Sequence, residues 1–488
     1  MTQRVSINAF MNVLYTVLAA LSGLVTMPIL VKELGAENYG IWTLIVATTL
    51  YFGALDLGVP AAAGRLFAAA REDIRAVNAV FSTAFATLCA IFLAVSLLVL
   101  LASWLFFEAF PVPIAQQPDA RAALLILGGG VALSIPAAVF ESFLWGSERF
   151  DLQNAIEIAV VIVRTLLIVF LIGSDSSLTV LALIIAGTGV AGGLIRILFC
   201  WRLQPGIELH WRHCSRQVLD EVSAFATWFT VLSASRSFSP NVPIFVIGYS
   251  LGAAAVTTFT IPRVLVIYAA GIITSAIVVI APRVAILYFA SRTAEQRDLF
   301  LAAGRFCMAL SYYFAGGFLF FGLPFIRIWQ PTMPGQEAYV LLLILLAGEL
   351  LPMTQRSSYG TILNMGKHRR LALYGLAELG MLGVLAFVLV QPYGLIGVCV
   401  AAAISNFLFR GLLEWTYGCA LVGISLTYYA LTVFLPLTGA ALGAFAFFWS
   451  LGLSQWNWFE LLMHGALYSV VYWVVLGPWL FMVRKSAA

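Results

Sequence analysis

"ENYGIWTLIVATTLYFGALDLGVPAAAGRLF", residues Glu37 to Phe67, is apolar enough over most of its length to cross a bilayer, yet it carries Asp56. The apolar run ends beside Arg65. About 20 consecutive apolar residues are enough for one helical crossing. A carboxylate in hydrocarbon is costly, so Asp56 must face other protein or water. The stretch therefore predicts a membrane-embedded helix with polar chemistry inside it.

The composition of the whole chain is that of an integral membrane protein. Of the 488 residues, 62% are apolar and 10% are charged, against about 45–50% and about 25% in soluble domains. The mean hydropathy is +1.00. The six cysteines show no motif spacing and predict no disulfide framework. No phosphate-binding loop of the G-x-x-x-x-G-K-[ST] type occurs, so we expect no nucleotide and no other cofactor.

Fourteen segments are long and apolar enough to cross a bilayer as helices. They cover residues 8–31, 39–66, 78–107, 121–146, 154–173, 177–203, 221–248, 253–281, 298–325, 337–365, 370–391, 394–420, 427–450 and 459–483. The connections between them are short. We therefore predict an all-α integral membrane protein of 14 helices without a folded extramembrane domain.

Positive charge is distributed unevenly between the two sides of the predicted membrane. Sixteen lysines and arginines lie on the side of the N-terminus, and only Lys32, Arg121 and Arg327 lie on the other. Because cytoplasmic loops carry the excess of Lys and Arg, this asymmetry predicts cytoplasmic N- and C-termini. Arg65 is then an anchor that reaches toward the inner headgroups.

The chain repeats itself at a spacing near 215 residues. Glu157 aligns with Glu378, and "RILFCW" (Arg196 to Trp201) aligns with "RGLLEW" (Arg410 to Trp415). Several further matches occur in the same order, which favours an internal duplication. Repeat units with an even number of helices enter the membrane from the same side and form a parallel repeat.

The duplication predicts three parts. The first is an N-lobe of six helices over residues 1–205, and the second is a C-lobe of six helices over residues 206–425. The last two helices, over residues 426–488, lie outside the repeat. Transporters built from such repeats bind their substrate near the midplane between the lobes.

"LGAENYGIWTLIVATTLYFGALDLGVPAAAGR" (Leu34 to Arg65) resembles the second-helix region of Wzx-type oligosaccharide flippases. These are polysaccharide transporters of the multidrug/oligosaccharidyl-lipid/polysaccharide (MOP) exporter superfamily. The pattern is a Leu-Gly turn, Tyr-Gly-Ile-Trp, an aromatic pair, Asp-Leu-Gly and a closing Arg. The plan of six, six and two helices agrees with this family along the whole length, and drug exporters and the lipid II flippase share that plan.

The resemblance implies a function and a mechanism. Such flippases move undecaprenyl-pyrophosphate-linked oligosaccharides from the inner to the outer leaflet of the bacterial inner membrane, for O-antigen lipopolysaccharide, capsule or exopolysaccharide synthesis. A V-shaped cavity between two lobes opens alternately to either side. The resemblance also implies a polysaccharide polymerase and a chain-length regulator as partners.

Seven arginines fall inside predicted spans, where each costs about 2.5–3.5 kcal/mol on insertion scales unless it faces protein or water. Four of them lie deep, and we predict that they line the substrate cavity: Arg164, Arg236, Arg263 and Arg356. A guanidinium presents a fork of donors that fits phosphate oxygens, so a lipid pyrophosphate is the expected ligand. Arg236 lies in "SASRSFSPNVP", where serines and prolines predict a broken, polar-lined helix.

The other three arginines, Arg196, Arg305 and Arg410, lie closer to inner helix ends, and we predict structural roles for them. Arg410 has Glu414 one turn further on, and that i,i+4 pair is its expected partner.

Four acids also fall inside spans: Asp56, Glu141, Glu349 and Glu378. Each is either the partner of a buried arginine or a protonatable group that couples an ion to transport, and the sequence leaves both open. Glu349 and Arg356 are seven residues apart, as are Glu157 and Arg164. Two helical turns span about 10 Å, so neither pair can touch unless the helix bends.

Two other functions fit parts of the sequence. A cation-coupled multidrug exporter on the same plan would make the acids central and the arginines their partners. A membrane glycosyltransferase or O-antigen polymerase would need a sizeable outer loop, and the longest one here has about a dozen residues, so we do not expect an enzyme. "HWRH" (His210 to His213) lacks a third metal ligand nearby and is predicted to be part of a basic inner loop, not a metal site.

Overall fold

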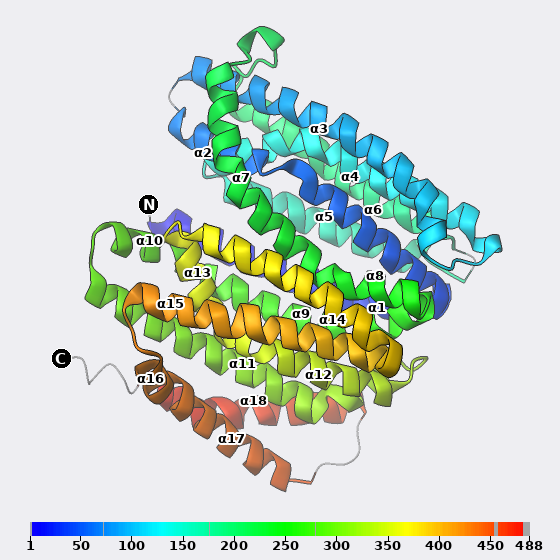
Figure 1. The fold of residues 1–488 in the computed structure, drawn as a ribbon, viewed down its shortest axis with the longest axis vertical. Helices are drawn as coiled ribbons and strands as arrows, with labels where there is room; N and C mark the ends of the chain where they lie inside the picture. The colour runs from blue at the N-terminus through cyan, green and yellow to red at the C-terminus, as the bar shows by residue number, and fades with distance from the viewer. Residues whose placement is uncertain (1, 72, 175, 279, 453–456, 482–488) are drawn as a thin grey trace. The chain divides into compact units, whose positions relative to one another are not determined.

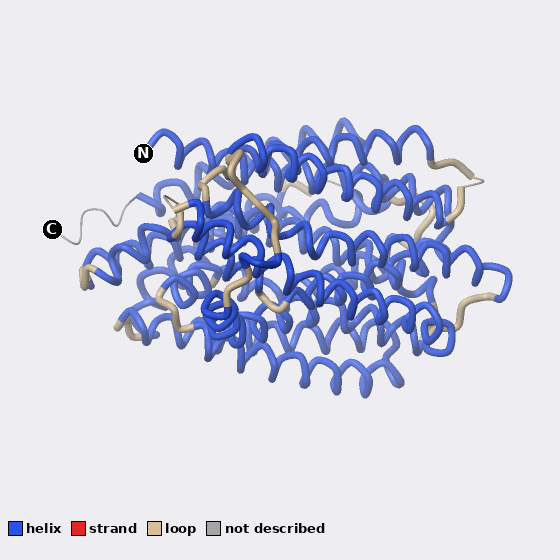
Figure 2. The backbone as a smooth tube through the Cα atoms, turned by 90° about the horizontal axis from the view of Figure 1, so that it is seen from above, coloured by secondary structure: helices blue, strands red, loops and turns tan. Residues whose placement is uncertain are grey.

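The computed structural model describes residues 2–71, 73–174, 176–278, 280–452 and 457–481. Every regular element within these ranges is a helix, and Figure 2 shows these helices joined by short loops. In this part of the chain, eleven helical segments are long and apolar enough to cross a membrane. Helices satisfy all their backbone hydrogen bonds internally, which hydrocarbon requires. The chain is thus an all-helical, multi-pass membrane protein.

Two of these segments are far longer than one crossing needs. Phe10–Ala69 has 60 residues and His368–Val422 has 55. Each contains a glycine with non-helical backbone, Gly35 at φ 80° and Gly394 at φ 55°. Positive φ values are accessible to glycine at little cost. Each long segment covers two of the predicted spans, and each glycine lies near their junction.

The chain forms two compact units, Met1–Thr257 and Thr258–Ala488, which we call unit 1 and unit 2. Figure 1 labels their helices in chain order. The elements of unit 1 are α1 (Thr2–Gly53), η1 (Ala54–Asp56), α2 (Val59–Ala69), α3 (Ile74–Ala109), η2 (Ile114–Gln116), α4 (Gln117–Gly146), α5 (Phe150–Leu171), α6 (Leu178–Leu203), η3 (Trp211–His213), α7 (Arg216–Phe238), η4 (Ser239–Asn241) and α8 (Val242–Ser250).

Helix α4 is at the centre of unit 1 and packs against α1, α2, α3 and α6. A cluster of rings fills the junction of α2, α3 and α4: Phe67 lies 5.1 Å from Phe81 and 5.5 Å from Phe143, centroid to centroid. Helix α7 packs against α2 and α3, and α8 packs against α1. The compact unit therefore extends beyond the predicted lobe of residues 1–205, which was defined by the repeat and stays a prediction.

Unit 2 begins within α9 (Ala253–Val278) and contains the remaining elements. These are α10 (Ala281–Phe289), α11 (Thr293–Trp329), α12 (Gly335–Thr354), α13 (Arg356–Asn364), α14 (His368–Ser405), the π-helical turn η5 (Asn406–Leu413), α15 (Glu414–Val422), α16 (Leu426–Tyr429), the π-helical turn η6 (Ala430–Phe434), α17 (Leu435–Ser450) and α18 (Trp458–Phe481).

The 37-residue helix α11 organises unit 2 and packs against α12, α17 and α18. Tyrosine hydroxyls attach the last two helices to it. Tyr472 donates to the Ala309 carbonyl at 2.6 Å, and the Tyr313 and Ser469 hydroxyls lie 2.7 Å apart. The two helices predicted outside the repeat thus pack on α11 inside unit 2.

The two units share one packing pattern. The short helix α2 packs against α3 and α4 in unit 1, and the short helix α10 packs against α11 and α13 in unit 2. In both cases a short helix precedes a long membrane helix and contacts it. This is the arrangement that an internal duplication predicts.

Candidate functional site

The opening stretch of sequence forms a broken helix in unit 1. Helix α1 ends at Gly53, η1 covers Ala54–Asp56, and Leu57 and Gly58 both have positive φ (54° and 69°) before α2 begins. The Asp56 carboxylate accepts a hydrogen bond of 2.9 Å from the Gly58 backbone N–H. Such an aspartate-to-backbone bond stabilises a turn. Asp56 makes no ion pair with any described residue, so its observed partner is its own backbone.

A second broken helix lies against this break. Helix α7 contacts η1, and α7 ends at Phe238, where η4 and then α8 follow. Tyr51 fixes the junction: its hydroxyl donates to the Phe238 carbonyl at 3.1 Å, and its ring packs edge-on against the Phe238 ring at 4.3 Å. The prediction of a broken helix around Arg236 is confirmed. Asp56 and Arg236 thus lie on two interrupted elements that touch.

Polar side chains line the break in α7. Ser235, Ser239 and Asn241 are all buried, and Asn241 donates to the Ser237 carbonyl at 3.1 Å. Interrupted membrane helices expose backbone polar groups that a substrate or ion can bind. The junction of α7 and α8 therefore places three polar side chains in the interior of unit 1.

Arg196 is paired with an acid on the neighbouring helix. Its guanidinium contacts the Glu157 carboxylate of α5 and donates to the Gln153 amide oxygen at 3.0 Å. The structural role predicted for Arg196 has a geometric basis. Glu157 therefore reaches Arg196 on α6 and not Arg164 two turns away on its own helix.

Unit 2 repeats this pair at the equivalent positions. The Arg410 guanidinium lies 2.7 Å from the Glu378 carboxylate, and Arg410 Nε donates to both of its oxygens at 2.8 and 2.9 Å. The sequence repeat aligns Glu157 with Glu378 and Arg196 with Arg410. Glu414, the partner that we expected, attracts Arg410 electrostatically, but the direct contact is made by Glu378. The π-helical turn directs Arg410 toward α14, where Glu378 is buried.

Glu349 and Arg356 do touch, because the helix between them breaks. Helix α12 ends at Thr354 and α13 begins at Arg356, and the two side chains meet at 2.7 Å. Asn406 donates to the second Glu349 oxygen at 2.9 Å. Arg356, proposed from the sequence for the cavity, is therefore neutralised within unit 2.

Sequence reasoning missed Asn406 and the π-helical turn that carries it. Asn406 and Arg410 both lie on η5, and each contacts an acid of a different helix. An asparagine in an apolar span is a usable signal, because a polar residue there needs a partner. The π-helical turn has no comparable signal. Such turns occur often at functional sites.

Arg164 differs from the paired arginines. Its Nε donates to the Thr188 hydroxyl of α6 at 3.0 Å, and no carboxylate of a described residue contacts it. The side chain is half-buried on α5. Its remaining N–H donors are therefore available in the interior of a membrane helix bundle.

The other predicted residues are placed as follows. Glu141 is half-buried on α4, makes no hydrogen bond or ion pair with a described residue, and lies within electrostatic range of Arg196, Glu157 and Asp56. Arg263 follows Pro262 in α9 and is half-buried in unit 2. Arg305, on α11, is 9% exposed.

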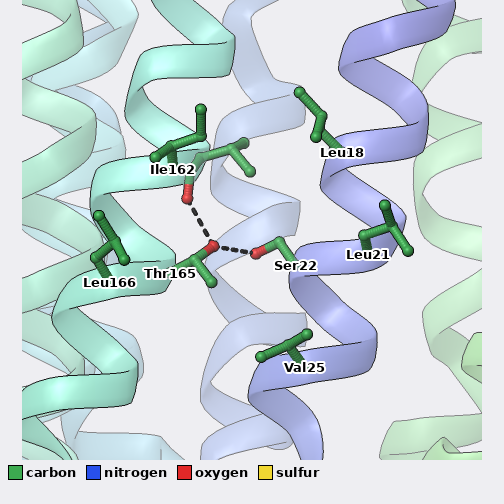
Figure 3. Close-up of a pocket in the computed structure, with 8 residues that line it drawn as sticks. Leu18, Leu21, Ser22, Val25, Ile162, Thr165 and Leu166 are labelled. Carbon is green, nitrogen blue, oxygen red and sulfur yellow. Dashed lines mark hydrogen bonds between the residues drawn. The ribbon is translucent and has the colours of Figure 1, made fainter.

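An apolar groove of about 210 Å³ lies along the contact of α1 with α5. Figure 3 shows the hydroxyls of Ser22 and Thr165 pointing toward each other. The two oxygens lie 2.6 Å apart, and the Thr165 hydroxyl also donates to the Val161 carbonyl at 2.7 Å. The other lining residues are Leu18, Leu21, Val25, Ile162 and Leu166. Its polar groups satisfy one another, so the groove suits hydrocarbon and is not a site for phosphate.

A family model described as polysaccharide biosynthesis protein matches residues 5–287, more than half of the chain. The chain belongs to this polysaccharide biosynthesis protein family. It is also 23% identical over 415 residues to a Shigella flexneri protein named "Putative O-antigen transporter", an alignment that covers 84% of this chain and 97% of the relative. The resemblance inferred from the second predicted helix is confirmed.

Solved structures show the fold of this family member to be that of MOP superfamily transporters. The lipid II flippase MurJ in an inward closed conformation matches with a TM-score of 0.72 at 13% identity, over 98% of this chain and 100% of the other. An inward-facing multidrug resistance MATE family transporter matches with a TM-score of 0.70 at 14% identity, over 85% and 98%. A MOP superfamily transporter from Pyrococcus furiosus matches with a TM-score of 0.65 at 14% identity, over 86% of this chain and 95% of the other.

Proposed function

We propose that this protein moves an undecaprenyl-pyrophosphate-linked oligosaccharide from the inner to the outer leaflet of the bacterial inner membrane, for O-antigen, capsule or exopolysaccharide synthesis. Its two six-helix lobes and two further helices give fourteen crossings, with both termini in the cytoplasm. A cavity between the lobes opens alternately to either side. Membership of the polysaccharide biosynthesis family and the Shigella relative support this proposal. A polysaccharide polymerase and a chain-length regulator are its proposed partners.

The chemical support for this proposal is the guanidinium of Arg164. Arg196, Arg356 and Arg410 each contact an acid within their own unit. Among the described residues, the hydrogen-bond partner of Arg164 is the Thr188 hydroxyl and no carboxylate pairs with it, so its cationic charge is not used up by an ion pair there. A guanidinium with open donors can bind phosphate oxygens in two-point contacts. We assign pyrophosphate binding to Arg164 together with Arg236 and Arg263, and Arg356 is the weakest member of the set because Glu349 neutralises it.

The test uses a strain that lacks the chromosomal copy of this protein and carries plasmid-borne variants. Arg164→Ala should reduce surface glycan export by about tenfold to a hundredfold, since a hydrogen bond to a charged group contributes about 1.5–3 kcal/mol. Arg164→Lys should keep part of the activity, because the charge remains and the fork is lost. The lipid-linked saccharide should accumulate on the inner leaflet.

The control separates function from folding. The Thr188 hydroxyl also donates to the Ile184 carbonyl at 2.8 Å, so it keeps a partner when Arg164 is truncated. Membrane abundance of Arg164→Ala should therefore equal that of the wild type. The matched variant Arg292→Gln alters an exposed arginine that pairs with Glu295 and should export normally. Normal export by Arg164→Ala would remove this residue from the site.

A cation-coupled multidrug exporter is the second candidate. Asp56 and Glu141 both lack an ion pair with a described residue, and an unpaired acid inside a membrane protein is what coupling to a cation requires. Binding to the purified protein separates the two functions. Tight binding of a cationic dye, with no competition by a polyprenyl pyrophosphate, would favour the exporter, and the reverse result favours the flippase.

A further inference from the structure

The loop between α6 and α7, residues 204–215, is bound along the first turns of α3. Asn78 holds it at two points: its amide donates to the Gly206 carbonyl at 3.1 Å and its carbonyl oxygen accepts from the Glu208 backbone N–H at 3.0 Å. The Asn78 side chain thus bonds to one backbone C=O and one backbone N–H of the loop, as the backbone of an adjacent β-strand would. We call this segment the Trp211 loop.

Two further side chains of α3 continue the attachment. The Ser82 hydroxyl accepts from the His210 backbone N–H at 3.3 Å, and the Thr83 hydroxyl accepts from the Ser215 backbone N–H at 2.9 Å. Asn78 and Ser82 are four residues apart and lie on one face of α3, and Thr83 follows Ser82 at the edge of that face. Figure 1 shows the loop at one end of unit 1, above the start of α7. The loop is therefore held in a defined conformation.

The attachment directs an aromatic and basic surface outward. Trp211 is 75% exposed, the Arg212 guanidinium carbon lies 5.4 Å from its ring centroid, and the His210 ring stacks on it at 5.8 Å. Exposed Arg202 and Arg216 flank the loop. From Arg202 to Arg216 the sequence contains three arginines and two histidines but only one acid.

We infer that the Trp211 loop binds the headgroups of anionic phospholipids. The loop joins the end of the membrane-crossing helix α6 to α7, which places it at the level of the headgroups. Tryptophan rings prefer this layer. Arginines next to an anionic leaflet gain attraction from its negative potential. The inference rests on the proposed orientation, because the anionic lipids face this loop only if it is cytoplasmic.

A lipid fits this surface better than a soluble anion does. Free phosphate would be bound by the arginines alone and would make no apolar contact with the exposed tryptophan. A phospholipid offers both a phosphate and a boundary between polar and apolar layers, which matches the Arg212–Trp211 stack. The shared chemistry is phosphate recognition, and the experiment distinguishes the two sources.

Cys214 supplies a native position for a probe. It is the exposed cysteine in the loop, whereas Cys200, Cys307, Cys399 and Cys419 are buried and Cys89 is half-buried. An environment-sensitive fluorophore on Cys214, in a Cys89→Ser background, is titrated in detergent with dioctanoyl-phosphatidylglycerol. We expect saturable binding that dioctanoyl-phosphatidylcholine does not reproduce and that inorganic phosphate does not displace.

The double variant Arg212→Gln/Arg216→Gln should bind the anionic lipid about 25-fold more weakly, at about fivefold for each arginine near an anionic surface. Trp211→Ser should also weaken binding. Arg292→Gln, in an exposed loop pair of unit 2, is the matched control and should bind as the wild type does. All of these side chains are exposed, so none of the variants should alter folding.

Three results of the titration would overturn the inference: equal affinity of the double variant, equal binding of phosphatidylcholine, or full displacement by inorganic phosphate. Labelling of Cys214 from outside intact cells would overturn both the orientation and this inference. The Arg164 export measurement does not depend on the Trp211 loop. A failed lipid titration therefore leaves the proposed function standing, and a failed export test leaves the lipid site standing.

Discussion

At the scale of the residue, Asp56 illustrates how a carboxylate can be accommodated inside an apolar segment. Its observed hydrogen-bond donor is the Gly58 N–H, at the point where two successive residues have positive φ. A break in a membrane helix leaves backbone groups without helical partners, and a short polar side chain can bond to one of them. Asp56 therefore stabilises the break whether or not it also binds a proton.

Asp56→Asn should leave the stability of the purified protein unchanged, because the amide oxygen can accept the same bond from Gly58. Asp56→Ala should lower the free energy of unfolding by about 1 kcal/mol, the usual net contribution of one hydrogen bond. Thermal unfolding in detergent measures both variants, with wild-type protein run alongside. An equal loss for Asn and Ala would contradict the capping role and point to the charge itself.

At the scale of the element, helices of this protein approach each other closely where glycines permit it. Helices α12 and α14 pack together, and a Cβ atom added at Gly348 would lie 2.6 Å from the Ala403 Cβ and 2.9 Å from its carbonyl oxygen. Small residues at helix crossings give membrane helices their packing contacts. The same crossing places Glu349 next to η5, where Asn406 reaches it.

Gly348→Ala should destabilise unit 2 by about 1–3 kcal/mol, the usual cost of overpacking a filled interior. The contact involves the Ala403 backbone, so no side-chain rotation can relieve it. Gly380→Ala on α14 is the matched control, because nothing lies within 4 Å of a Cβ added there. Detergent unfolding should separate the two variants, and an unchanged midpoint for Gly348→Ala would show that the helices can move apart.

At the scale of the whole molecule, each unit contains an equivalent Arg–Glu ion pair. Glu157 with Arg196 and Glu378 with Arg410 occupy equivalent positions of the sequence repeat. The acids differ in environment: the Glu157 side chain is 27% exposed and the Glu378 side chain 1%. Each pair joins two helical elements of its own unit.

Glu378→Gln should destabilise its unit by up to about 3–5 kcal/mol, because the buried Arg410 loses the carboxylate that it contacts. Glu157→Gln should destabilise unit 1 in the same way but by less, since that pair is less buried. Hydrogen exchange should rise in α14 and η5 for the first variant and in α5 and α6 for the second. As a control, Glu295→Gln removes an exposed ion pair and should lower the free energy of unfolding by less than about 1 kcal/mol. Faster exchange in the opposite unit would contradict the local role of each pair.

Much of the architecture was accessible from the sequence, because it depends on local properties. Apolar length sets where a helix can cross, and serines and prolines around Arg236 predicted the break that ends α7 at Phe238. The repeat could be found in the sequence because matching segments, such as those around Glu157 and Glu378, occur in the same order in both halves. These features need no knowledge of which helix lies beside which.

The choice of charge partners was decided only by the tertiary structure. From the sequence, Glu414 was the nearest acid to Arg410 and Glu349 was out of reach of Arg356. In the structure Arg410 pairs with Glu378, 32 residues away, and a helix break brings Glu349 to Arg356. An ion pair depends on a few ångströms between side chains, which the packing of neighbouring helices fixes and the spacing along one chain does not.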